Sequence, residues 1–124
     1  MARVALEKTI TLALSVKDRH ASAAWYEEML GFELRYHIDE AGWSEMNTKT
    51  PDVVLGLGEQ VDANPGNAIP VFGVSDIGPA RAALEEAGVR FDGPTQTMEG
   101  MVSLATFYDP DDNALMLAKD LSQQ

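Results

Sequence analysis

Two neighbouring stretches of the chain carry the residue types that bind small organic molecules. In the first, large apolar residues alternate with polar ones, which predicts that Arg35 and His37 share one face of a strand. In the second, Trp43 and Glu45 share a face by the same alternation. An indole ring can stack on a planar or cationic ligand, and a carboxylate or a guanidinium can fix its charge. We therefore expect these four side chains to line one end of a pocket, with an exposed sheet end as the alternative.

The chain offers few other groups for catalysis or metal binding. His37 and Glu45 are candidates for an acid–base pair or a non-standard metal pair. The other histidine, His20, falls in the first turn of an expected helix and is expected to be exposed. There is no cysteine, and two histidines give no convincing Ser-His-Asp triad. The acidic stretch at 109–113 lacks the spacing of a calcium loop and is interpreted as a turn.

Composition limits the partners that we expect. The sequence has 124 residues with a net charge of −11, enough for one compact domain, which we expect over 1–124. This charge opposes binding to nucleic acid or to an anionic membrane, and it favours cationic ligands. No apolar run is long enough for a membrane helix, and no secretory signal is evident at the N-terminus. We expect a soluble cytoplasmic protein whose partner is a small molecule.

A repeat organises the chain. A strand, an alanine-rich helix, a glycine and a second strand occur twice, with Val16 and Val74 58 positions apart and Gly31 and Gly88 57 apart. Such a repeat indicates two copies of one module, with a functional site at their junction. We place module one at about 9–58, a linker at about 59–67 and module two at about 68–119.

Each module is predicted to have the order β-α-β-β-β. In module one, the helix begins after Asp18 and ends at Gly31, because Asp is a common N-cap and Gly a common C-terminal stop. In module two, Pro79 suits the first turn of the helix, and Gly88 ends it. The predicted strands are 9–16, 32–39, 43–48 and 53–57 in module one, and 68–74, 89–91, 101–108 and 114–118 in module two.

At this point the chain resembles a known superfamily. Val16-x-Asp18, then Trp25-Tyr26 before Leu30-Gly31-Phe32, and later Asp109-Pro110-Asp111-Asp112-Asn113, are similar to motifs of the vicinal oxygen chelate superfamily, which includes glyoxalase I, extradiol dioxygenases and bleomycin-resistance proteins. The resemblance implies an α+β fold in which two βαβββ modules form a curved mixed sheet with helices outside. It also implies a ligand cavity between the modules and a homodimer.

The resemblance further implies a metal site, held in the enzymes by His, Glu or Gln on the first and last strands of each module. Counting from the motifs places these positions at Thr11, Gly56, Ile69 and Met116. None is His, Glu or Asp, so we expect no bound metal and no cofactor. Strand alternation independently predicts that Thr11 and Met116 face the cavity.

The leading functional hypothesis is therefore metal-independent binding of a small organic ligand in the cavity between the modules. Two alternatives stay open: a glyoxalase-like lyase, isomerase or dioxygenase using displaced ligands such as His37 and Glu45, and a structural or regulatory module without a ligand. Whether the protein is an enzyme is left undecided. The expected ligand-binding residues are Thr11, Arg35, His37, Trp43, Glu45 and Met116.

Overall fold

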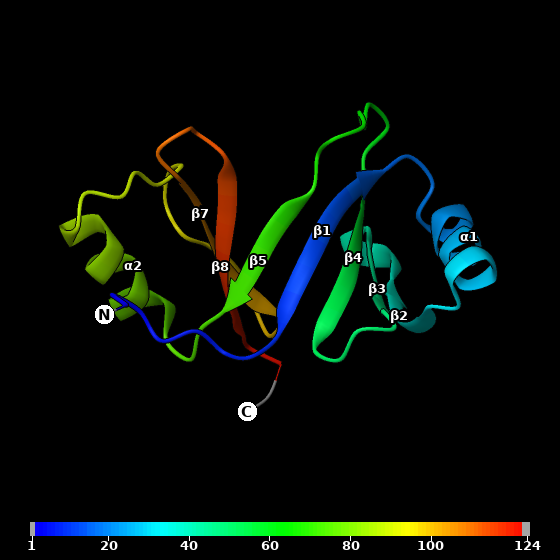
Figure 1. Ribbon diagram of the computed structural model, residues 1–124, viewed down its shortest axis with the longest axis horizontal. Helices are drawn as coiled ribbons and strands as arrows, with labels where there is room; N and C mark the ends of the chain where they lie inside the picture. Colours follow the sequence, from blue (N-terminus) through cyan, green and yellow to red (C-terminus); the bar gives the residue numbers. More distant parts are fainter. Residues whose placement is uncertain (1, 123–124) are drawn as a thin grey trace. The chain divides into compact units, whose positions relative to one another are not determined.

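The computed structural model describes residues 2–122, so both ends of the domain expected over 1–124 lie outside the described residues. Two compact units form within the described chain. In the structure, module one is Thr9–Ile69, and module two combines residues 2–8 with residues 70–122. Each unit holds one βαβββ repeat, so the α+β fold of two such modules is confirmed (Figure 1).

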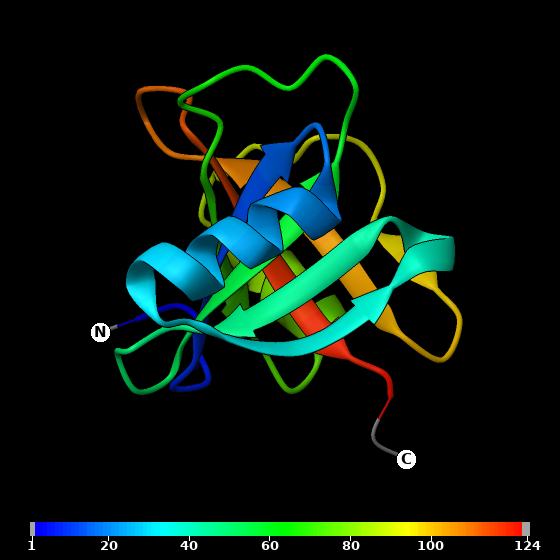
Figure 2. The ribbon, with the colours of Figure 1, turned by 90° about the vertical axis from the view of Figure 1, so that its right-hand side faces the viewer.

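Module one contains a mixed four-stranded sheet in the order β2-β3-β4-β1. Strands β1 and β4 are parallel, and the other neighbours are antiparallel. Its elements in chain order are β1 (Ile10–Val16), α1 (Arg19–Leu30), β2 (Glu33–Ile38), the 3-10 turn η1 (Asp39–Ala41), β3 (Trp43–Asn47) and β4 (Val53–Glu59). Figure 2 shows α1 and β2 of this module in the foreground.

The ends of α1 are set by the two residues expected from the sequence. The Asp18 side chain accepts a hydrogen bond from the backbone N–H of Ala21 at 3.1 Å, which satisfies one of the free donors of the first turn. Gly31 ends the helix at φ 71°, a left-handed conformation that costs glycine little. Helix α1 is therefore fixed at both ends by local chemistry.

The core of module one lies between α1 and one face of the sheet. Ala23 of the helix is buried with Met46, Leu55 and Leu57 of the strands. The residues packed against this group are Leu12, Leu14, Val16, Tyr26 and Phe32. Because strand side chains alternate between faces, Thr11, Ala13 and Ser15 of β1 point to the face away from the helix, as expected. We call this second face the open face of module one.

Module two repeats this plan with the sheet order β5-β8-β7-β6. Strands β5 and β8 are parallel, and the others are antiparallel. Its elements are β5 (Ile69–Gly73), α2 (Ile77–Glu86), β6 (Gln96–Met98), β7 (Val102–Tyr108) and β8 (Ala114–Asp120). Val74, Ile77, Ala105 and Leu117 form its buried core between helix and sheet.

One strand of module two lies elsewhere than predicted. The sequence analysis placed the second strand at 89–91, whereas the structure has it at β6, Gln96–Met98, beyond Gly93. Phe91 makes only an isolated bridge with Phe107, and both rings pack against the core below α2. The apolar ring of Phe91 reflects packing against this core rather than membership of a regular strand.

The acidic stretch at 109–113 is a turn, as predicted. One carboxylate oxygen of Asp109 accepts hydrogen bonds from the backbone N–H groups of Asp111 and Asn113, each at 2.9 Å. A hydrogen bond from the Asn113 side chain, followed by these backbone bonds, favours the charged carboxylate and lowers the pKa of Asp109. Over the part of the chain that the structure describes, no helix is long and apolar enough to cross a membrane.

Candidate functional site

The open face of module one brings Trp43 close to two glycines of the adjacent strand. Trp43 of β3 pairs with Gly58 of β4, and Glu45 pairs with Gly56, so all four positions share this face. The Trp43 ring lies directly over Gly56, where an added Cβ would collide with the indole. At Gly58 a Cβ would meet the ring at an ordinary 3.6 Å. The absence of a side chain at Gly56 therefore allows the indole to lie across the sheet.

Glu45 supplies a partly buried carboxylate beside this ring. One oxygen accepts a hydrogen bond from the Trp43 indole N–H at 2.9 Å. The other lies 3.9 Å from the Nε atom of Arg35, and the Glu45 side chain is 19% exposed. The indole bond and the loose ion pair fix the direction of the carboxylate without covering it. The group can therefore accept a hydrogen bond or a positive charge from a ligand.

Thr11 completes this group from β1. Its Cγ2 methyl would lie 3.2 Å from a Cβ at Gly56, so Thr11 and Trp43 approach the same glycine from two sides. The structure thus brings together Thr11, Arg35, Trp43 and Glu45, four of the six residues expected to bind a ligand. We call these four residues the Trp43–Glu45 site.

His37 lies on the opposite face from this site. A β-bulge between Leu34 and Tyr36 makes Arg35 an extra residue in β2, which reverses the direction of the side chains that follow. His37 therefore pairs with Ser44 on the helix side of the sheet. The sequence analysis assumed an unbroken alternation and grouped His37 with Glu45. That grouping is wrong, so the two residues do not form the acid–base or metal pair considered above.

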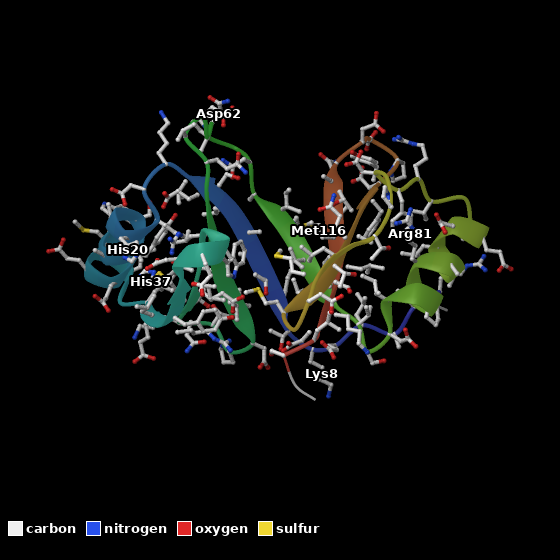
Figure 3. All side chains as sticks on the ribbon, turned by 180° about the vertical axis from the view of Figure 1, so that it is seen from behind. Lys8, His20, His37, Asp62, Arg81 and Met116 are labelled. Atoms are coloured by element: carbon white, nitrogen blue, oxygen red, sulfur yellow. The ribbon has the colours of Figure 1, made fainter. Side chains whose placement is uncertain are left out.

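Met116 belongs to module two. It pairs with Val71 in β5 and with Thr106 in β7, while its neighbour Leu117 is buried against α2. By alternation, Met116 lies on the face of its sheet away from the helix, as expected, and it is half-buried (Figure 3).

A second polar group occupies the helix side of module one, where the sequence analysis predicted no site. It is centred on Arg19, which is buried. The Arg19 guanidinium donates to the Ser44 hydroxyl at 2.8 Å and to Asp39 Oδ1 at 3.0 Å. Glu59 lies on its other side, with Oε1 3.5 Å from Nε. Two carboxylates thus compensate one buried cation, which is the usual requirement for burying a charge.

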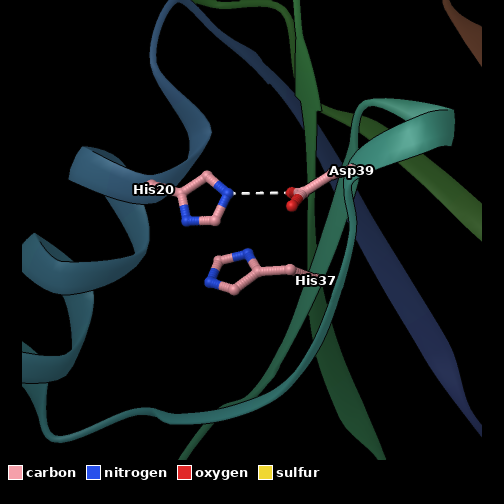
Figure 4. A group of neighbouring side chains, drawn as sticks. All are labelled: His20, His37 and Asp39. Carbon is pink, nitrogen blue, oxygen red and sulfur yellow. Dashed lines mark hydrogen bonds and ion pairs between the residues drawn. The ribbon is translucent and has the colours of Figure 1, made fainter.

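Both histidines of the sequence join this group. Nε2 of His20 lies 2.9 Å from Asp39 Oδ1 (Figure 4). Nδ1 of His37 lies 2.5 Å from the Ser44 hydroxyl. The two imidazole rings stack, with centroids 3.8 Å apart and planes 23° apart. Hydrogen bonds from His20 and Arg19 lower the pKa of Asp39. The sequence carried one indication of this group. Ser44 lies two residues before Met46, so strand alternation places both on the same face.

The residues at the positions that the resemblance assigns to metal ligands do not fit a metal ion. In module one these are Thr11, which offers a single hydroxyl, and Gly56, where the Trp43 ring occupies the space of a side chain. On β5 and β8 they are Ile69 and Met116, of which one is a hydrocarbon and the other a thioether. A borderline divalent cation prefers imidazole and carboxylate donors, which these four residues lack.

Solved structures with the same fold carry several different names. Methylmalonyl-CoA epimerase from Mycobacterium tuberculosis is 16% identical, with a TM-score of 0.73, 97% of this chain covered and 92% of the other. The Streptomyces coelicolor methylmalonyl-CoA epimerase Q60A variant, in complex with 2-nitronate-propionyl-CoA, is 19% identical, with a TM-score of 0.69 and coverages of 94% and 99%. A structure named NAD-dependent benzaldehyde dehydrogenase, from Legionella pneumophila, is 17% identical, with a TM-score of 0.73 and coverages of 90% and 98%. At these identities the likeness shows the fold alone.

The family comparison is more specific. No curated protein matches the sequence. The model of the Glyoxalase/Bleomycin resistance protein/Dioxygenase superfamily matches residues 9–117, which include all eight strands from the start of β1 into β8. The chain therefore belongs to this superfamily, the vicinal oxygen chelate group that its motifs resemble.

Proposed function

We propose that this protein binds a small organic molecule at the Trp43–Glu45 site, without a metal ion. The observation that carries the proposal is the Glu45 carboxylate, which the Trp43 indole N–H and Arg35 hold in place on an open face rich in small residues. A ring and a carboxylate side by side are complementary to a planar group that carries a positive charge. The net charge of −11 also favours cationic ligands.

The metal-free part of the proposal has its own support. At the superfamily's ligand positions in module one, Thr11 and Gly56 give one hydroxyl and no carboxylate or imidazole. The displaced pair considered from the sequence, His37 and Glu45, is divided between the two faces of the sheet. We therefore infer that side chains alone, without a metal ion, recognise the ligand at this site.

A planar aromatic cation is the appropriate first probe. We expect N-methylquinolinium to bind metal-stripped protein and to quench the fluorescence of Trp43 in a Trp25→Phe background, which removes the other tryptophan. Glu45→Gln should weaken this binding by about tenfold, equivalent to about 1.4 kcal/mol, because the variant loses the charge and keeps the shape. Equal affinity for a quinoline carboxylate, or unchanged binding after Glu45→Gln, would contradict the proposal.

Trp43→Ala and Trp25→Ala form a matched pair for this experiment. Trp25 is 52% exposed on α1, outside the Trp43–Glu45 site. We expect Trp43→Ala to abolish binding of the probe, measured by calorimetry, and Trp25→Ala to leave it unchanged. Restoring metal ions to the stripped protein should not change the affinity, because no metal takes part.

A further inference from the structure

We propose that His20, His37 and Asp39 form a binding site for a divalent transition-metal ion of the Zn²⁺ class. The site lies on the helix side of module one and is separate from the Trp43–Glu45 site on the open face. Its three residues come from three elements that meet at this point, the first turn of α1, the end of β2 and the start of η1 (Figure 4). One donor atom from each residue lies within 4.8 Å of the others.

The spacing of these atoms is close to that of a coordination sphere. Zn²⁺ binds nitrogen and oxygen ligands at about 2.0–2.2 Å in a tetrahedron, which sets neighbouring ligand atoms about 3.4 Å apart. Nε2 of His20 and Oδ1 of Asp39 are already 2.9 Å apart. The His20 side chain is 54% exposed, so its ring can rotate to complete the sphere. The site therefore needs only local side-chain adjustment, not a movement of the backbone.

The charges around the site favour a cation. Arg19 is the nearby positive charge: its guanidinium donates to Asp39 Oδ1 at 3.0 Å, and Oε1 of Glu59 lies 3.5 Å from its Nε. With neutral imidazoles, Arg19, Glu59 and Asp39 together carry one net negative charge. A divalent ion bound to the two imidazoles and the carboxylate is therefore attracted by this net negative charge.

Supporting hydrogen bonds hold His37 in place. Its Nδ1 contacts the Ser44 hydroxyl, which is buried and receives a hydrogen bond from Arg19. Figure 4 shows that this Nδ1 is the His37 nitrogen on the side of His20 and Asp39, so a metal ion bound there would take the place of the Ser44 contact. Two imidazoles and a carboxylate select ions such as Zn²⁺ over Mg²⁺ and Ca²⁺, which prefer oxygen ligands. Three protein ligands leave at least one position for water at this partly exposed site.

The composition of the chain makes the test selective. The sequence contains no cysteine and only two histidines, so any site built on nitrogen ligands must use His20 or His37. We would titrate tag-free, metal-stripped protein with Zn²⁺ alone and follow calorimetry together with the two histidine Cε1–H signals in the NMR spectrum. We expect one ion per chain, displacement of both signals, and no competition from Mg²⁺.

Variants identify the ligands. His20→Gln, at a half-exposed position, should weaken Zn²⁺ binding by about tenfold or more. Losing even a residue that only orients a metal ligand weakens binding by this order, and His20 is proposed to be a ligand itself. His37→Gln and Asp39→Asn should have effects of the same size. Glu40→Gln removes an exposed carboxylate adjacent to Asp39 and should leave the affinity unchanged. Thermal unfolding of each metal-free variant checks that it is folded.

Two results would overturn the proposal. In the first, His20→Gln binds Zn²⁺ as tightly as the original protein, or only one histidine signal moves on titration. In the second, Glu40→Gln weakens binding as much as Asp39→Asn, which would indicate non-specific attraction to the acidic surface. Neither result depends on ligand binding at the Trp43–Glu45 site, so the two proposals are tested separately.

Discussion

Gly56 shows how a residue without a side chain can define a site. Its neighbours on the open face are the Trp43 ring and the Thr11 methyl group, and the ring occupies the space above its Cα. The indole N–H then reaches Glu45, so the position of the carboxylate depends on the flat placement of the ring. The absence of a side chain at Gly56 therefore determines where the Glu45 carboxylate lies, because the Trp43 ring connects the two.

Substitution at this glycine tests that dependence. Gly56→Ala should destabilise the protein by about 1–3 kcal/mol, the usual cost of overpacking, because the new Cβ displaces the Trp43 ring. Gly58→Ala is the matched control, since its Cβ would make only ordinary contacts with the same ring. Urea unfolding of the two variants gives the comparison, and equal losses of unfolding free energy would show that Trp43 does not constrain Gly56.

At the scale of elements, the two helices begin in different ways. Asp18 and Asp76 occupy the same position before α1 and α2, and both have extended backbones. Only the Asp18 side chain makes a capping hydrogen bond, whereas Asp76 makes none. The repeat in the sequence is thus preserved in residue type but not in the contact that the residue makes.

This difference predicts unequal effects of the same substitution. Asp18→Ala should lower the free energy of unfolding by about 1 kcal/mol, because it removes an N-cap hydrogen bond. Asp76→Ala should cost clearly less. Thermal or urea unfolding of the two variants measures both values, and a loss at Asp76 as large as that at Asp18 would contradict the assignment of the caps.

Features that depend on neighbouring residues in the chain could be predicted from the sequence. The side-chain directions that the β-bulge reverses could not. Asp18 and Gly31 define α1 by capping and by a left-handed φ, and Trp43 and Glu45 share a face by simple alternation. The residue type at Arg35 gives no indication of a β-bulge. The apolar residues Tyr36 and Ile38 therefore led to a prediction of regular alternation in β2. One extra residue moved His37 to the other face, which is why the cluster with His20 and Asp39 was missed.

At the scale of the whole molecule, the acidic charge bears on the proposed capture of a cationic ligand. There are 20 acidic and 9 basic residues. A field of this sign raises the local concentration of cations around the protein and acts at long range in dilute salt. The charge belongs to the chain as a whole, whereas the proposed recognition depends on the few residues around Trp43.

The salt concentration therefore distinguishes the contribution of the overall charge from that of the residues around Trp43. Raising NaCl from about 20 mM to about 500 mM shortens the screening length from about 20 Å to about 4 Å and should weaken binding of N-methylquinolinium several-fold. Neutral quinoline should bind with an affinity that salt leaves nearly unchanged. Calorimetry at both salt concentrations makes the comparison. Parallel losses for the two ligands would mean that the acidic charge plays no part in capture.

The path of the chain through module two has a consequence for biosynthesis. Residues 2–8 precede module one in the chain yet belong to module two, where the Glu7 N–H bonds to the Gly73 carbonyl at 2.8 Å. Module one is a continuous segment and can fold as soon as it leaves the ribosome. Residues 2–8 have no partner strand until residue 73 has been translated. A segment made early therefore docks late, and a nascent chain that has emerged from the ribosome only as far as residue 69 would carry a complete first module beside an unattached N-terminal segment.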